Sequence, residues 1–488
     1  MAQKKTKIVA TISDMRCDVD FIQSLYNEGI NVVRMNSAHM TEEGFVRVIN
    51  NVRAVSKTIG IMMDTKGPEI RTTATASGEK IKVSTGDKLR IIGDINVLST
   101  PEQVSVSYPS IVKDVPVGNI LLIDDGETAL KVIEKTADAL IVEVQNDGTI
   151  GSRKSVNIPG VSINLPSITA KDKACIEIAI KYGADFIAHS FVRHKGDVLD
   201  VQKILDEHNS DIKIIAKIEN QEGVDNIDEI YEHAYGVMVA RGDLGIEVPQ
   251  EKIPGIQRLL IRKAIEYKKP VIVATQMLHT MIENPRPTRA EVADIANAVY
   301  YGTDAVMLSG ETAYGKYPVE AVRTMAQVAA AAEESKLQEK VTPVPFKDAE
   351  YDITSFLAKQ AVKSATQLGI SAILTDSYTG RTARTLAAFR SKAPVYAFCC
   401  KEEVARQLSV CYGVTATYQE STGMTTHKHK EYFVKALDGL LEQGLIKKSD
   451  DVAYLSGSFG EGKGTTFLEI NNVGRVVDAK DAFQVPVD

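Results

Sequence analysis

Eight short runs of apolar, β-branched residues constrain the fold of this chain more than any other feature, because helix-like segments separate them. The runs begin at Lys7, Asn31, Gly60, Asp185, Lys213, Gly236, Pro270 and Asp304. Near-continuous apolar strands are typical of a parallel sheet that is covered on both faces. Eight such strands alternating with helices predict an α/β protein built on a closed (β/α)8 barrel, or TIM barrel.

The spacing of these runs breaks once, between the third and the fourth, where about 100 residues intervene and a strand–helix–strand unit needs far fewer. From Pro68 to Pro166 the pattern changes to short alternating segments punctuated by glycine, such as 79–87 and 139–148. This pattern predicts a small antiparallel β domain of the β-barrel type. Because the domain leaves the carboxyl end of a barrel strand, we expect it to cover the mouth as a hinged lid.

An alanine-rich helix over 319–334 and a proline-bearing linker over 340–347 follow the eighth run. Beyond the linker, helices and strands alternate to the end of the chain, which predicts an open α/β sheet. The expected domains are a barrel of residues 1–67 and 168–338, an inserted β lid of residues 68–167, and a C-terminal α/β regulatory domain of residues 339–488.

Composition narrows the classes of protein to which the chain can belong. Of its 488 residues, 44% are apolar and 25% charged, which is typical of a soluble multidomain protein. A net charge of −7 argues against nucleic-acid and anionic-membrane partners. We find neither a secretory signal nor an apolar run of about 18 residues, and expect no membrane span. The five cysteines form no C-x-x-C pair and fit buried thiols in a reducing cytoplasm.

Polar residues gather where the predicted strands end, and barrel enzymes place their active sites at the carboxyl ends of their strands. The residues at these positions are Arg34, Asn36, Asp64, Thr65, Lys66, Lys217, Glu219, Arg241, Asp243, Thr275, Ser309 and Glu311. Several of them are cations, carboxylates or hydroxyls, a combination that predicts a site for a phosphate and a divalent metal.

Two carboxylates on neighbouring strands, Glu219 and Asp243, suit Mg²⁺, which usually takes one or two protein carboxylates together with substrate oxygens and water. Lys217 lies two residues before Glu219, so both side chains project toward the mouth. A lysine there neutralises charge that develops on a transferring phosphoryl group or on an enolate oxygen. The alternative is an interior salt bridge, because layers of side chains fill such barrels.

Gly242 and Gly245 lie in the stretch 239–245, where a strand gives way to a helix. Backbone N–H groups and the helix dipole at such a junction attract a carboxylate or a phosphate, although a simple tight turn is the alternative. Arg34 presents a planar fork to phosphate oxygens, or it serves only as a salt-bridge partner.

Taken together, these stretches resemble the pyruvate kinase family over essentially the whole chain. The stretches that carry the resemblance, in the order of the family, are Arg34-Met-Asn, 63–72, 216–223, 238–245, 274–278, 284–292 and 307–313. The resemblance implies transfer of the phosphoryl group of phosphoenolpyruvate to ADP, giving ATP and pyruvate in the last step of glycolysis, with Mg²⁺ and K⁺ as cofactors.

The resemblance also implies roles for individual residues. Lys217 would stabilise the transferring phosphoryl group and the enolate, Glu219 and Asp243 would bind Mg²⁺, and Thr275 and Ser309 would belong to the water-linked relay that protonates the enolate. Arg71 and Lys154 would contact the phosphates of the nucleotide. The implied substrate contacts are Arg34, Ala240, Arg241, Gly242, Asp243 and Thr275.

Potassium ligands of the family match Asn36, Asp64 and Thr65, but Ala38 stands where the family usually has a serine hydroxyl. Glu69 is the residue type found in K⁺-dependent members. The resemblance therefore implies activation by K⁺ with an altered affinity.

A hydroxyl-rich loop that opens a helix suits the phosphate of a regulatory effector, and its alternative role is an N-cap and turn. The candidate effector residues are Thr375, Ser377, Thr379, Gly380, Arg381 and Thr382. The resemblance further implies allosteric regulation and a homotetramer.

Two other functions fit parts of the sequence. A catalytically silent sensor would bind sugar phosphates through the third domain, but it would not need the full set of strand-end residues. Another barrel enzyme that acts on phosphoenolpyruvate or an enolate, such as a lyase or an aldolase, would leave the inserted domain, Arg71 and Lys154 without a role.

Overall fold

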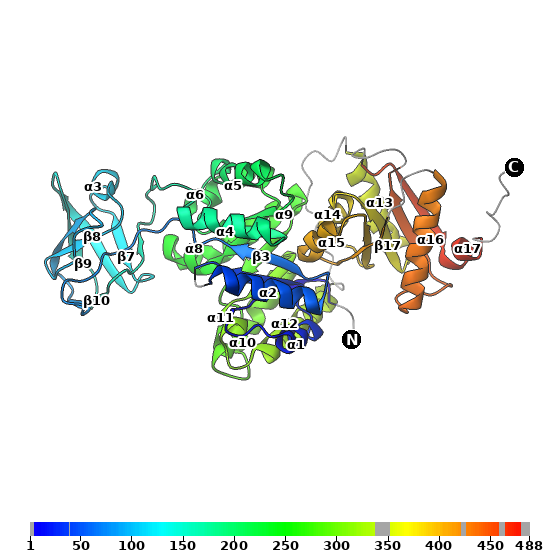
Figure 1. The fold of residues 1–488 in the computed structure, drawn as a ribbon, viewed down its shortest axis with the longest axis horizontal. Helices are drawn as coiled ribbons and strands as arrows, with labels where there is room; N and C mark the ends of the chain where they lie inside the picture. The colour runs from blue at the N-terminus through cyan, green and yellow to red at the C-terminus, as the bar shows by residue number, and fades with distance from the viewer. Residues whose placement is uncertain (1–3, 39, 337–351, 421–425, 458–463, 480–488) are drawn as a thin grey trace.

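The computed structural model describes residues 4–38, 40–336, 352–420, 426–457 and 464–479. Three parts lie in a row: a β-rich part at the left, a barrel in the centre and an α/β part at the right (Figure 1). The linker predicted over 340–347 lies outside the described residues. No helix in the described ranges is long and apolar enough to cross a membrane. All five cysteines are free thiols.

The centre is a closed barrel of eight parallel strands, as the eight apolar runs predicted. Around the barrel the strand order is β1-β16-β15-β14-β13-β12-β3-β2. The strands are β1 (Lys7–Thr11), β2 (Val32–Asn36), β3 (Gly60–Asp64), β12 (Phe186–His189), β13 (Lys213–Ile218), β14 (Gly236–Ala240), β15 (Val271–Ala274) and β16 (Ala305–Leu308).

Helices cover the outside of the barrel. They are α1 (Val19–Asn27), α2 (Glu42–Val55), α4 (Ala170–Lys181), α5 (Lys195–Glu207), α6 (Gln221–Asp225), α7 (Ile227–His233), α8 (Arg241–Glu247), α9 (Ile253–Tyr267), α10 (Arg289–Tyr301), α11 (Gly310–Ala313) and α12 (Pro318–Lys336), with 3₁₀ turns at Gln250–Lys252 and His279–Ile282. Side-chain caps fix where several of them begin. Thr169 with Asp172, and Thr288 with Glu291, form capping boxes that satisfy the first N–H groups of α4 and α10.

Alternate residues of each strand serve two cores. In β3, Ile61 and Met63 pack against the helices, whereas Met62 points into the barrel. The interior core continues from Met62 to Leu408 and Cys411 of the C-terminal part. Apolar side chains thus close the amino end of the barrel, and the carboxyl ends of the strands are left for polar residues.

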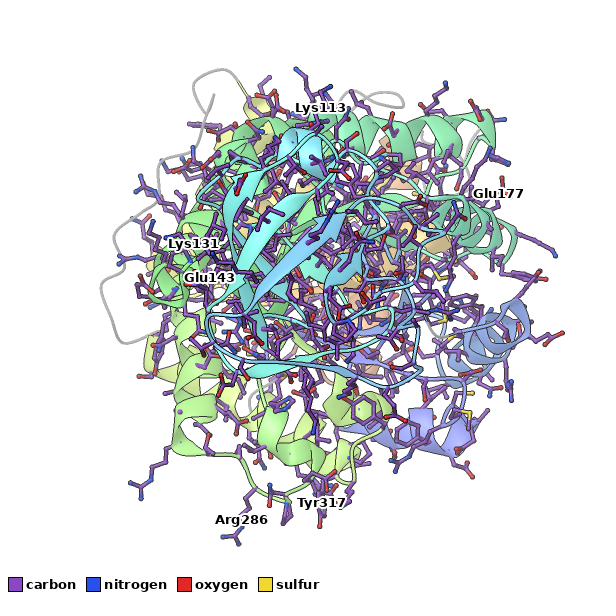
Figure 2. All side chains as sticks on the ribbon, turned by 90° about the vertical axis from the view of Figure 1, so that its left-hand side faces the viewer. Lys113, Lys131, Glu143, Glu177, Arg286 and Tyr317 are labelled. Carbon is purple, nitrogen blue, oxygen red and sulfur yellow. The ribbon has the colours of Figure 1, made fainter. Side chains whose placement is uncertain are left out.

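The insertion between β3 and β12 forms the predicted small β domain, which we call the lid after its proposed role. Its elements are β4 (Ile81–Val83), β5 (Lys88–Ile92), β6 (Gln103–Ser105), α3 (Ile111–Asp114), β7 (Ile120–Ile123), β8 (Thr128–Lys135), β9 (Leu140–Val144), β10 (Gly148–Ile150) and β11 (Val156–Asn157). They pair as a six-stranded sheet, β11-β7-β8-β9-β5-β6, and a two-stranded sheet, β10-β4, around one core. One pair differs from the antiparallel prediction, because β5 and β6 run parallel. Figure 2, viewed from the lid end, shows the lid in front of the barrel.

The C-terminal part is the predicted open sheet, in the order β19-β18-β17-β20-β21, parallel except for the edge strand β21. Its elements are α13 (Ile353–Gln367), β17 (Ala372–Ser377), α14 (Arg381–Ala388), β18 (Val395–Cys399), α15 (Glu402–Gln407), a 3₁₀ turn at Leu408–Val410, β19 (Val414–Tyr418), α16 (Thr426–Glu442), β20 (Asp451–Ser456), β21 (Phe467–Asn472) and α17 (Val473–Asp478).

Two buried aspartates at the amino end of the barrel hold this part in place. Asp185, just before β12, accepts hydrogen bonds from Arg53 of the barrel at 2.8 Å and from Arg406 of the C-terminal part at 2.7 Å. Asp304, just before β16, pairs with Arg390 at 2.8 Å. Asp185 therefore binds an arginine from each part, whereas Asp304 accepts from Arg390 of the C-terminal part and from the N–H of Val271 in the barrel at 3.2 Å. These charge-assisted bonds join the two parts in addition to the apolar packing.

Candidate active site

A cavity of about 480 Å³ opens at the carboxyl ends of the barrel strands. Its polar and charged lining residues are Arg34, Asn36, Asp64, Thr65, Lys66, Glu69, Arg71, Arg153, Ser190, Lys217, Glu219 and Asp243. Eight of these are among the residues predicted to bind substrate, nucleotide or metal: Arg34, Asn36, Asp64, Thr65, Arg71, Lys217, Glu219 and Asp243. The cavity therefore gathers cations and carboxylates from separate strands and from the lid side.

Lys217 is the best-connected charge in the cavity. Its ammonium lies 2.9 Å from Glu219 Oε1 and 3.0 Å from Asp64 Oδ1, and it donates to Ser190 Oγ at 2.7 Å. The side chain is only 10% exposed. Burial alone would lower the pKa of Lys217, but Asp64 and Glu219 outweigh burial and raise it. The lysine is therefore a fixed positive charge at the mouth of the barrel.

Arg34 joins this network through Asp64. Arg34 Nε donates to Asp64 Oδ2 at 2.5 Å, and its Nη1 donates to Thr11 Oγ1 at 3.1 Å. Burial raises the pKa of Asp64, but Arg34 and Lys217 overcome this and hold the pKa below its ordinary value. Asp64 thus stays ionised and orients both cations toward one side of the mouth.

Glu219 is a buried carboxylate with spare capacity to bind a cation. The backbone N–H of Phe191 donates to its Oε2 at 2.6 Å. Burial raises the pKa of Glu219 to about 7; Lys217 opposes this shift, and Asp243 adds to it. Negative charge at Glu219 and Asp243 is therefore only partly compensated by the protein.

The donor set fits a hard divalent cation. Glu219 and Asp243 line the same cavity, and Mg²⁺ takes one or two carboxylates when substrate oxygens and water complete its octahedron. Within the described ranges, no group of three or more histidine, cysteine or acidic side chains is arranged to hold a metal by itself. A cation here would depend on substrate for part of its coordination.

The junction between β14 and α8 differs in detail from the prediction. The hydroxyl of Thr275 accepts a hydrogen bond from the N–H of Gly242 at 2.8 Å and donates to Ala274 O at 2.6 Å. Thr275 adopts a left-handed backbone conformation, with φ of 67°, which brings the loop after β15 against α8. The N–H of Gly242 already has a protein partner in this conformation.

The side chain of Arg241 is turned away from the cavity. Its Nη1 donates to both carboxylate oxygens of Asp294 at 2.7 Å, and its Nη2 donates to Thr275 O at 2.6 Å. The predicted contact between Arg241 and substrate therefore has to run through its backbone and not through its guanidinium. Ala240, directly before it, is 1% exposed and likewise offers only backbone atoms.

Ser309 lies at the start of α11, outside the residues that line the cavity. Its N–H donates to Glu311 Oε2 at 2.7 Å, and Glu311 Oε1 accepts from the N–H of Leu278 at 3.1 Å. Glu311 therefore binds the loop after β16 to the loop after β15. This arrangement places Ser309 in the loop next to that of Thr275.

The three predicted potassium ligands share the cavity but have protein partners. Asn36 Oδ1 accepts from the N–H of Ala38 at 3.0 Å, and Thr65 Oγ1 accepts from the N–H of Ser190 at 3.0 Å. Asp64 is held between two cations, as described above. Oxygen atoms of all three residues are of the type that a hard cation binds.

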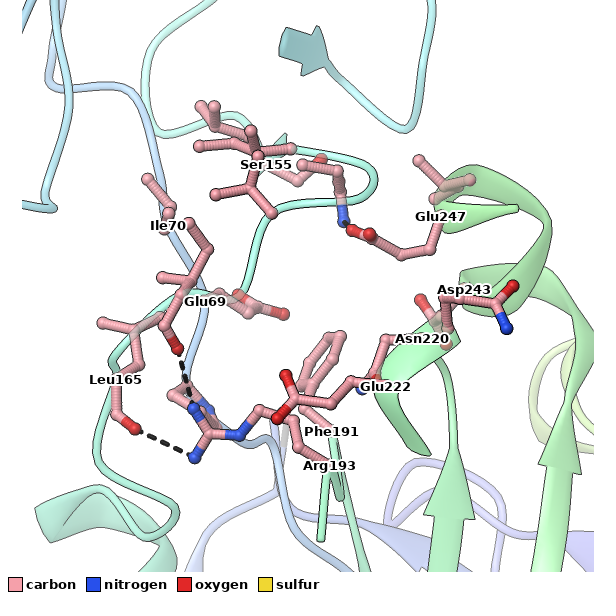
Figure 3. A pocket seen from close by; sticks show the side chains of 18 of the residues that line it. Glu69, Ile70, Ser155, Leu165, Phe191, Arg193, Asn220, Glu222, Asp243 and Glu247 are labelled. Carbon is pink, nitrogen blue, oxygen red and sulfur yellow. Dashed lines mark hydrogen bonds between the residues drawn. The ribbon is translucent and has the colours of Figure 1, made fainter. Parts of the chain in front are cut away.

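A second cleft, of about 600 Å³, lies between the lid and the barrel and shares Asp243 with the first (Figure 3). Arg71 and Lys154 line it from the lid side. Glu69 holds Arg71 Nε at 2.6 Å, and Asp124 holds Lys154 Nζ at 2.7 Å. Both residues that are predicted to contact the nucleotide therefore line a cleft that adjoins Glu219 and Asp243.

Contacts at the base of the lid fix the chain where it returns to the barrel. Arg193 donates to Ile163 O at 2.8 Å and to Leu165 O at 3.0 Å, the two dashed lines in Figure 3. Across the cleft, Asn157 Nδ2 donates to Glu247 Oε1 at 3.1 Å. These bonds link the lid to the barrel in the conformation described.

Sequence reasoning missed two polar residues of the cavity. Ser190 accepts from Lys217 and donates to Thr65 O at 2.7 Å, so it fixes the ammonium between two strands. Its place at the end of the fourth apolar run was the only available signal. Arg153 reaches the cavity from a lid loop where its φ is 59°, and no pattern in the sequence indicates that approach.

The predicted effector loop is an internally bonded turn. The N–H of Gly380 donates to Ser377 Oγ at 3.0 Å, Thr375 Oγ1 donates to Asp376 O at 2.9 Å, and Thr382 pairs with Thr465 at 2.6 Å. Thr379 and Arg381 are exposed. These bonds match the turn in the alternative interpretation of the loop, but Gly380 stands at the N-cap of α14 and no side chain caps that helix. The facing loop over 456–464 lies partly outside the described residues.

Behind the cavity, His189 gives a testable dependence of stability on pH. Its Nε2 is buried without a hydrogen-bond partner, and burial lowers its pKa from 6.5 to about 4 despite Asp197 and Asp172. Between these two values the unfolded chain binds more protons, so stability falls as the pH falls from 6.5 toward 4. The full effect is about 3 kcal/mol.

We expect His189→Gln to remove this contribution, which is measurable as a flatter profile of the thermal midpoint against pH than that of the wild type. His233→Gln, at an exposed position, is the matched control and should leave the profile unchanged. Parallel profiles for wild type and His189→Gln would contradict the assignment.

Comparisons with known proteins agree with the geometry. The chain matches the family model for the barrel domain of pyruvate kinase over residues 3–322 and the model for its alpha/beta domain over residues 355–470. It is 47% identical to the pyruvate kinase of Borreliella burgdorferi, over 99% of this chain and 100% of that one. With the pyruvate kinase of Geobacillus stearothermophilus it shares 44% identity, over 99% of this chain and 83% of that one. The crystal structure of a pyruvate kinase from Cryptosporidium parvum superposes with a TM-score of 0.88 at 38% identity, covering 96% of each chain.

Proposed function

The chain belongs to the pyruvate kinase family and transfers the phosphoryl group of phosphoenolpyruvate to ADP, and we propose that the cavity around Lys217 carries out this transfer. The observation that carries the proposal is the placement of Lys217 within 3.0 Å of both Asp64 and Glu219, beside Asp243 and Arg34. Phosphoryl transfer depends mainly on positioning and on cations that offset charge on the equatorial oxygens. The cavity supplies both.

In this mechanism the ammonium of Lys217 stabilises the negative charge on the moving phosphoryl group and on the enolate oxygen that it leaves. Arg34 provides N–H donors to the phosphoryl oxygens, with Asp64 holding its orientation. Glu219 and Asp243 would hold Mg²⁺, which would supply positive charge to offset the negative charge of the substrate oxygens. No side chain need form a covalent bond to phosphorus.

After transfer, the enolate takes up a proton to become pyruvate. Thr275 and Ser309 lie in neighbouring loops and form part of the relay that delivers this proton through water. Backbone groups of Ala240, Arg241 and Gly242 bind the carboxylate of the substrate at the start of α8. For the N–H of Gly242 to take part, Thr275 has to exchange its hydrogen bond for one to substrate or water.

The adjoining cleft accommodates the nucleotide, with Arg71 and Lys154 directed to its phosphates. ADP bound there would lie next to Asp243, which lines both cavities together with Glu69, Arg71 and Phe191. Closure of the lid would bring the two phosphate groups together and exclude water.

A coupled assay with lactate dehydrogenase, phosphoenolpyruvate, ADP and Mg²⁺ tests the activity directly. We expect turnover that requires phosphoenolpyruvate, ADP and Mg²⁺ together. Binding of sugar phosphates without any turnover would instead favour the silent sensor.

Potassium is proposed as the second cofactor, bound by Asn36, Asp64 and Thr65. We expect the rate to rise with KCl to a plateau while tetramethylammonium chloride keeps the ionic strength constant. Because Ala38 supplies no hydroxyl, Ala38→Ser should lower the K⁺ concentration needed for half-maximal rate. Equal rates with and without K⁺ would contradict this prediction.

We propose the regulation, the oligomeric state and the cellular location from the membership of the chain in the family. A phosphorylated effector would bind at Thr375–Thr382 of the C-terminal domain, the chain would assemble as a homotetramer, and it would act in the cytoplasm. The domain limits at 67/68, 167/168 and 338/339 belong to this proposal. The steady-state rate against phosphoenolpyruvate, with and without sugar phosphates and AMP, would identify the effector class.

A further inference from the structure

Arg153 has no role in the mechanism above, although it lines the active-site cavity from the lid. It lies between β10 and β11, in a loop that is bonded to the segment through which the chain enters the lid. The N–H of Thr72 donates to Lys154 O at 2.8 Å, and the N–H of Lys154 donates to Thr72 Oγ1 at 2.9 Å. Arg71 Nη1 donates to Arg153 O at 2.7 Å. The backbone of Arg153 is therefore held within the lid, and Arg153 moves when the lid moves.

Arg153 and Lys154 are neighbours in the chain, but they face different cavities. Arg153 lines the cavity that holds Lys217, and it does not line the cleft between lid and barrel. Lys154 lines that cleft and not the cavity. Arg153 adopts a left-handed backbone conformation, with φ of 59°, which is uncommon for a residue other than glycine. This loop of the lid therefore presents one cation to each of the two cavities.

The charge of Arg153 differs from the other positive charges of the cavity in having no counter-ion. The cations that line the cavity are Arg34, Lys66, Arg71, Arg153 and Lys217. Asp64 lies 2.5 Å from Arg34 and 3.0 Å from Lys217. Glu69 lies 3.1 Å from Lys66 and 2.6 Å from Arg71. Among the described residues, no carboxylate oxygen lies within 4.0 Å of the guanidinium of Arg153, and that guanidinium makes no hydrogen bond.

The position of Arg153 matches the side from which the acceptor phosphate would arrive. Lys217 and Arg34 lie at the barrel strands, where the phosphoryl group of the substrate would bind. The nucleotide would enter between lid and barrel, so its terminal phosphate would meet that phosphoryl group on the lid side of the cavity. Two phosphate groups that approach each other repel, and a cation beside them offsets this repulsion. An unpaired guanidinium on the lid side is placed to supply this cation.

We propose that Arg153 binds the terminal phosphate of the nucleotide, which in ADP is the β-phosphate that accepts the phosphoryl group. This inference rests on the proposed function. The planar guanidinium donates two parallel N–H groups to phosphate oxygens, a geometry that a lysine does not offer. Arg71 and Lys154, the two other lid-side cations, already have carboxylate partners in Glu69 and Asp124. Arg153 therefore adds positive charge that these two pairs do not supply.

The contact would make the acceptor site selective for a nucleoside diphosphate. A nucleoside monophosphate has no β-phosphate, so it would gain nothing from the guanidinium of Arg153. Because the backbone of Arg153 is held within the lid, the guanidinium reaches the nucleotide together with the lid. Closure of the lid would therefore be favoured more by ADP than by a monophosphate.

The first test is steady-state kinetics of Arg153→Gln in the coupled assay. We expect the KM for ADP to rise about tenfold or more, because a hydrogen-bonded charge is lost, while the KM for phosphoenolpyruvate changes less than about twofold. Arg153 is exposed, so the variant should fold. Arg153→Lys keeps the charge without the planar fork and should recover part of the affinity for ADP. Lys131→Gln removes an exposed lysine of the lid remote from the cavity and should leave both KM values unchanged.

A second measurement does not depend on turnover. Phosphorus NMR spectra of ADP are recorded while the full chain is added, with oxalate and Mg²⁺ present. We expect the wild type to shift the β-phosphate resonance more than Arg153→Gln does, whereas the α-phosphate resonance shifts alike with both chains. An unchanged KM for ADP in a folded Arg153→Gln chain, or the same β-phosphate shift with both chains, would overturn the inference. Absence of turnover by the wild type would instead contradict the proposed function, and the NMR titration would still decide whether Arg153 contacts ADP.

Discussion

Replacing Lys217 with methionine is expected to lower kcat by about 10³-fold or more, because the chain then has no ammonium at the point where charge develops in the transition state. Methionine keeps most of the length of the side chain, so the barrel should still fold. Ser190, Asp64 and Glu219 would lose their shared hydrogen-bond donor. The coupled assay measures kcat, and the KM for phosphoenolpyruvate should change far less than kcat.

The control for this variant lies on the same strand. Lys213 begins β13 at the end of the barrel remote from the cavity, and Lys213→Met removes a half-buried lysine of the same strand without touching the proposed site. It should retain near wild-type kcat. Unchanged turnover in a folded Lys217→Met chain would contradict the role assigned to the ammonium.

Loss of either carboxylate that we propose as a metal ligand is expected to have the second large effect. We expect Glu219→Gln and Asp243→Asn to raise the Mg²⁺ concentration for half-maximal rate by about tenfold or more, because each removes one negative charge and one strong oxygen ligand. The rate at saturating Mg²⁺ should fall as well. Titration of the coupled assay with MgCl₂ measures both quantities.

Glu247→Gln is the matched control for the metal variants. Glu247 lies one turn after Asp243 on α8, lines only the neighbouring cleft and is bonded to Asn157. Glu247 has the same charge as the two proposed ligands but lies at a different position. The Glu247→Gln change should therefore leave the dependence of the rate on Mg²⁺ unchanged. If the Glu219→Gln, Asp243→Asn and Glu247→Gln variants all had the same Mg²⁺ dependence, Glu219 and Asp243 would not be the metal ligands.

The barrel was predictable from sequence because each strand is apolar on both faces, a pattern that few folds require. The polar mouth followed from the same pattern, since parallel strands present their carboxyl ends on one side. The strand-end residues Arg34, Lys217 and Glu219 therefore meet across the sheet although they are far apart in the chain. The position of a residue at a strand end was enough to place it near the others.

Orientation of side chains was less predictable than position. Arg241 follows a strand as the others do, but Asp294 on α10 draws its guanidinium away from the mouth. Only the tertiary fold brings Asp294 within reach of Arg241, and no local pattern in the sequence encodes this contact. Ser190 was not predicted, because a serine at a strand end is too common to indicate a role by itself. Its role follows only from its hydrogen bond with Lys217, which the structure shows.

The structure of the lid was also only partly predictable from the sequence. Alternation and glycine spacing predicted its strands, but the parallel pairing of β5 with β6 depends on the course of the chain between them. The approach of Arg153 to the cavity depends on the position of the whole lid relative to the barrel. Contacts between domains depend on the tertiary structure, and local patterns in a single sequence do not predict them.

Anomalous diffraction from crystals grown with Mn²⁺ and oxalate, a planar dianion shaped like the enolate of pyruvate, shows directly whether Glu219 and Asp243 bind the metal. We expect one strong metal peak that both carboxylates ligate, with oxalate completing the coordination and the ammonium of Lys217 beside it. A metal peak away from these two carboxylates, or no peak at all, would show that they are not the metal ligands.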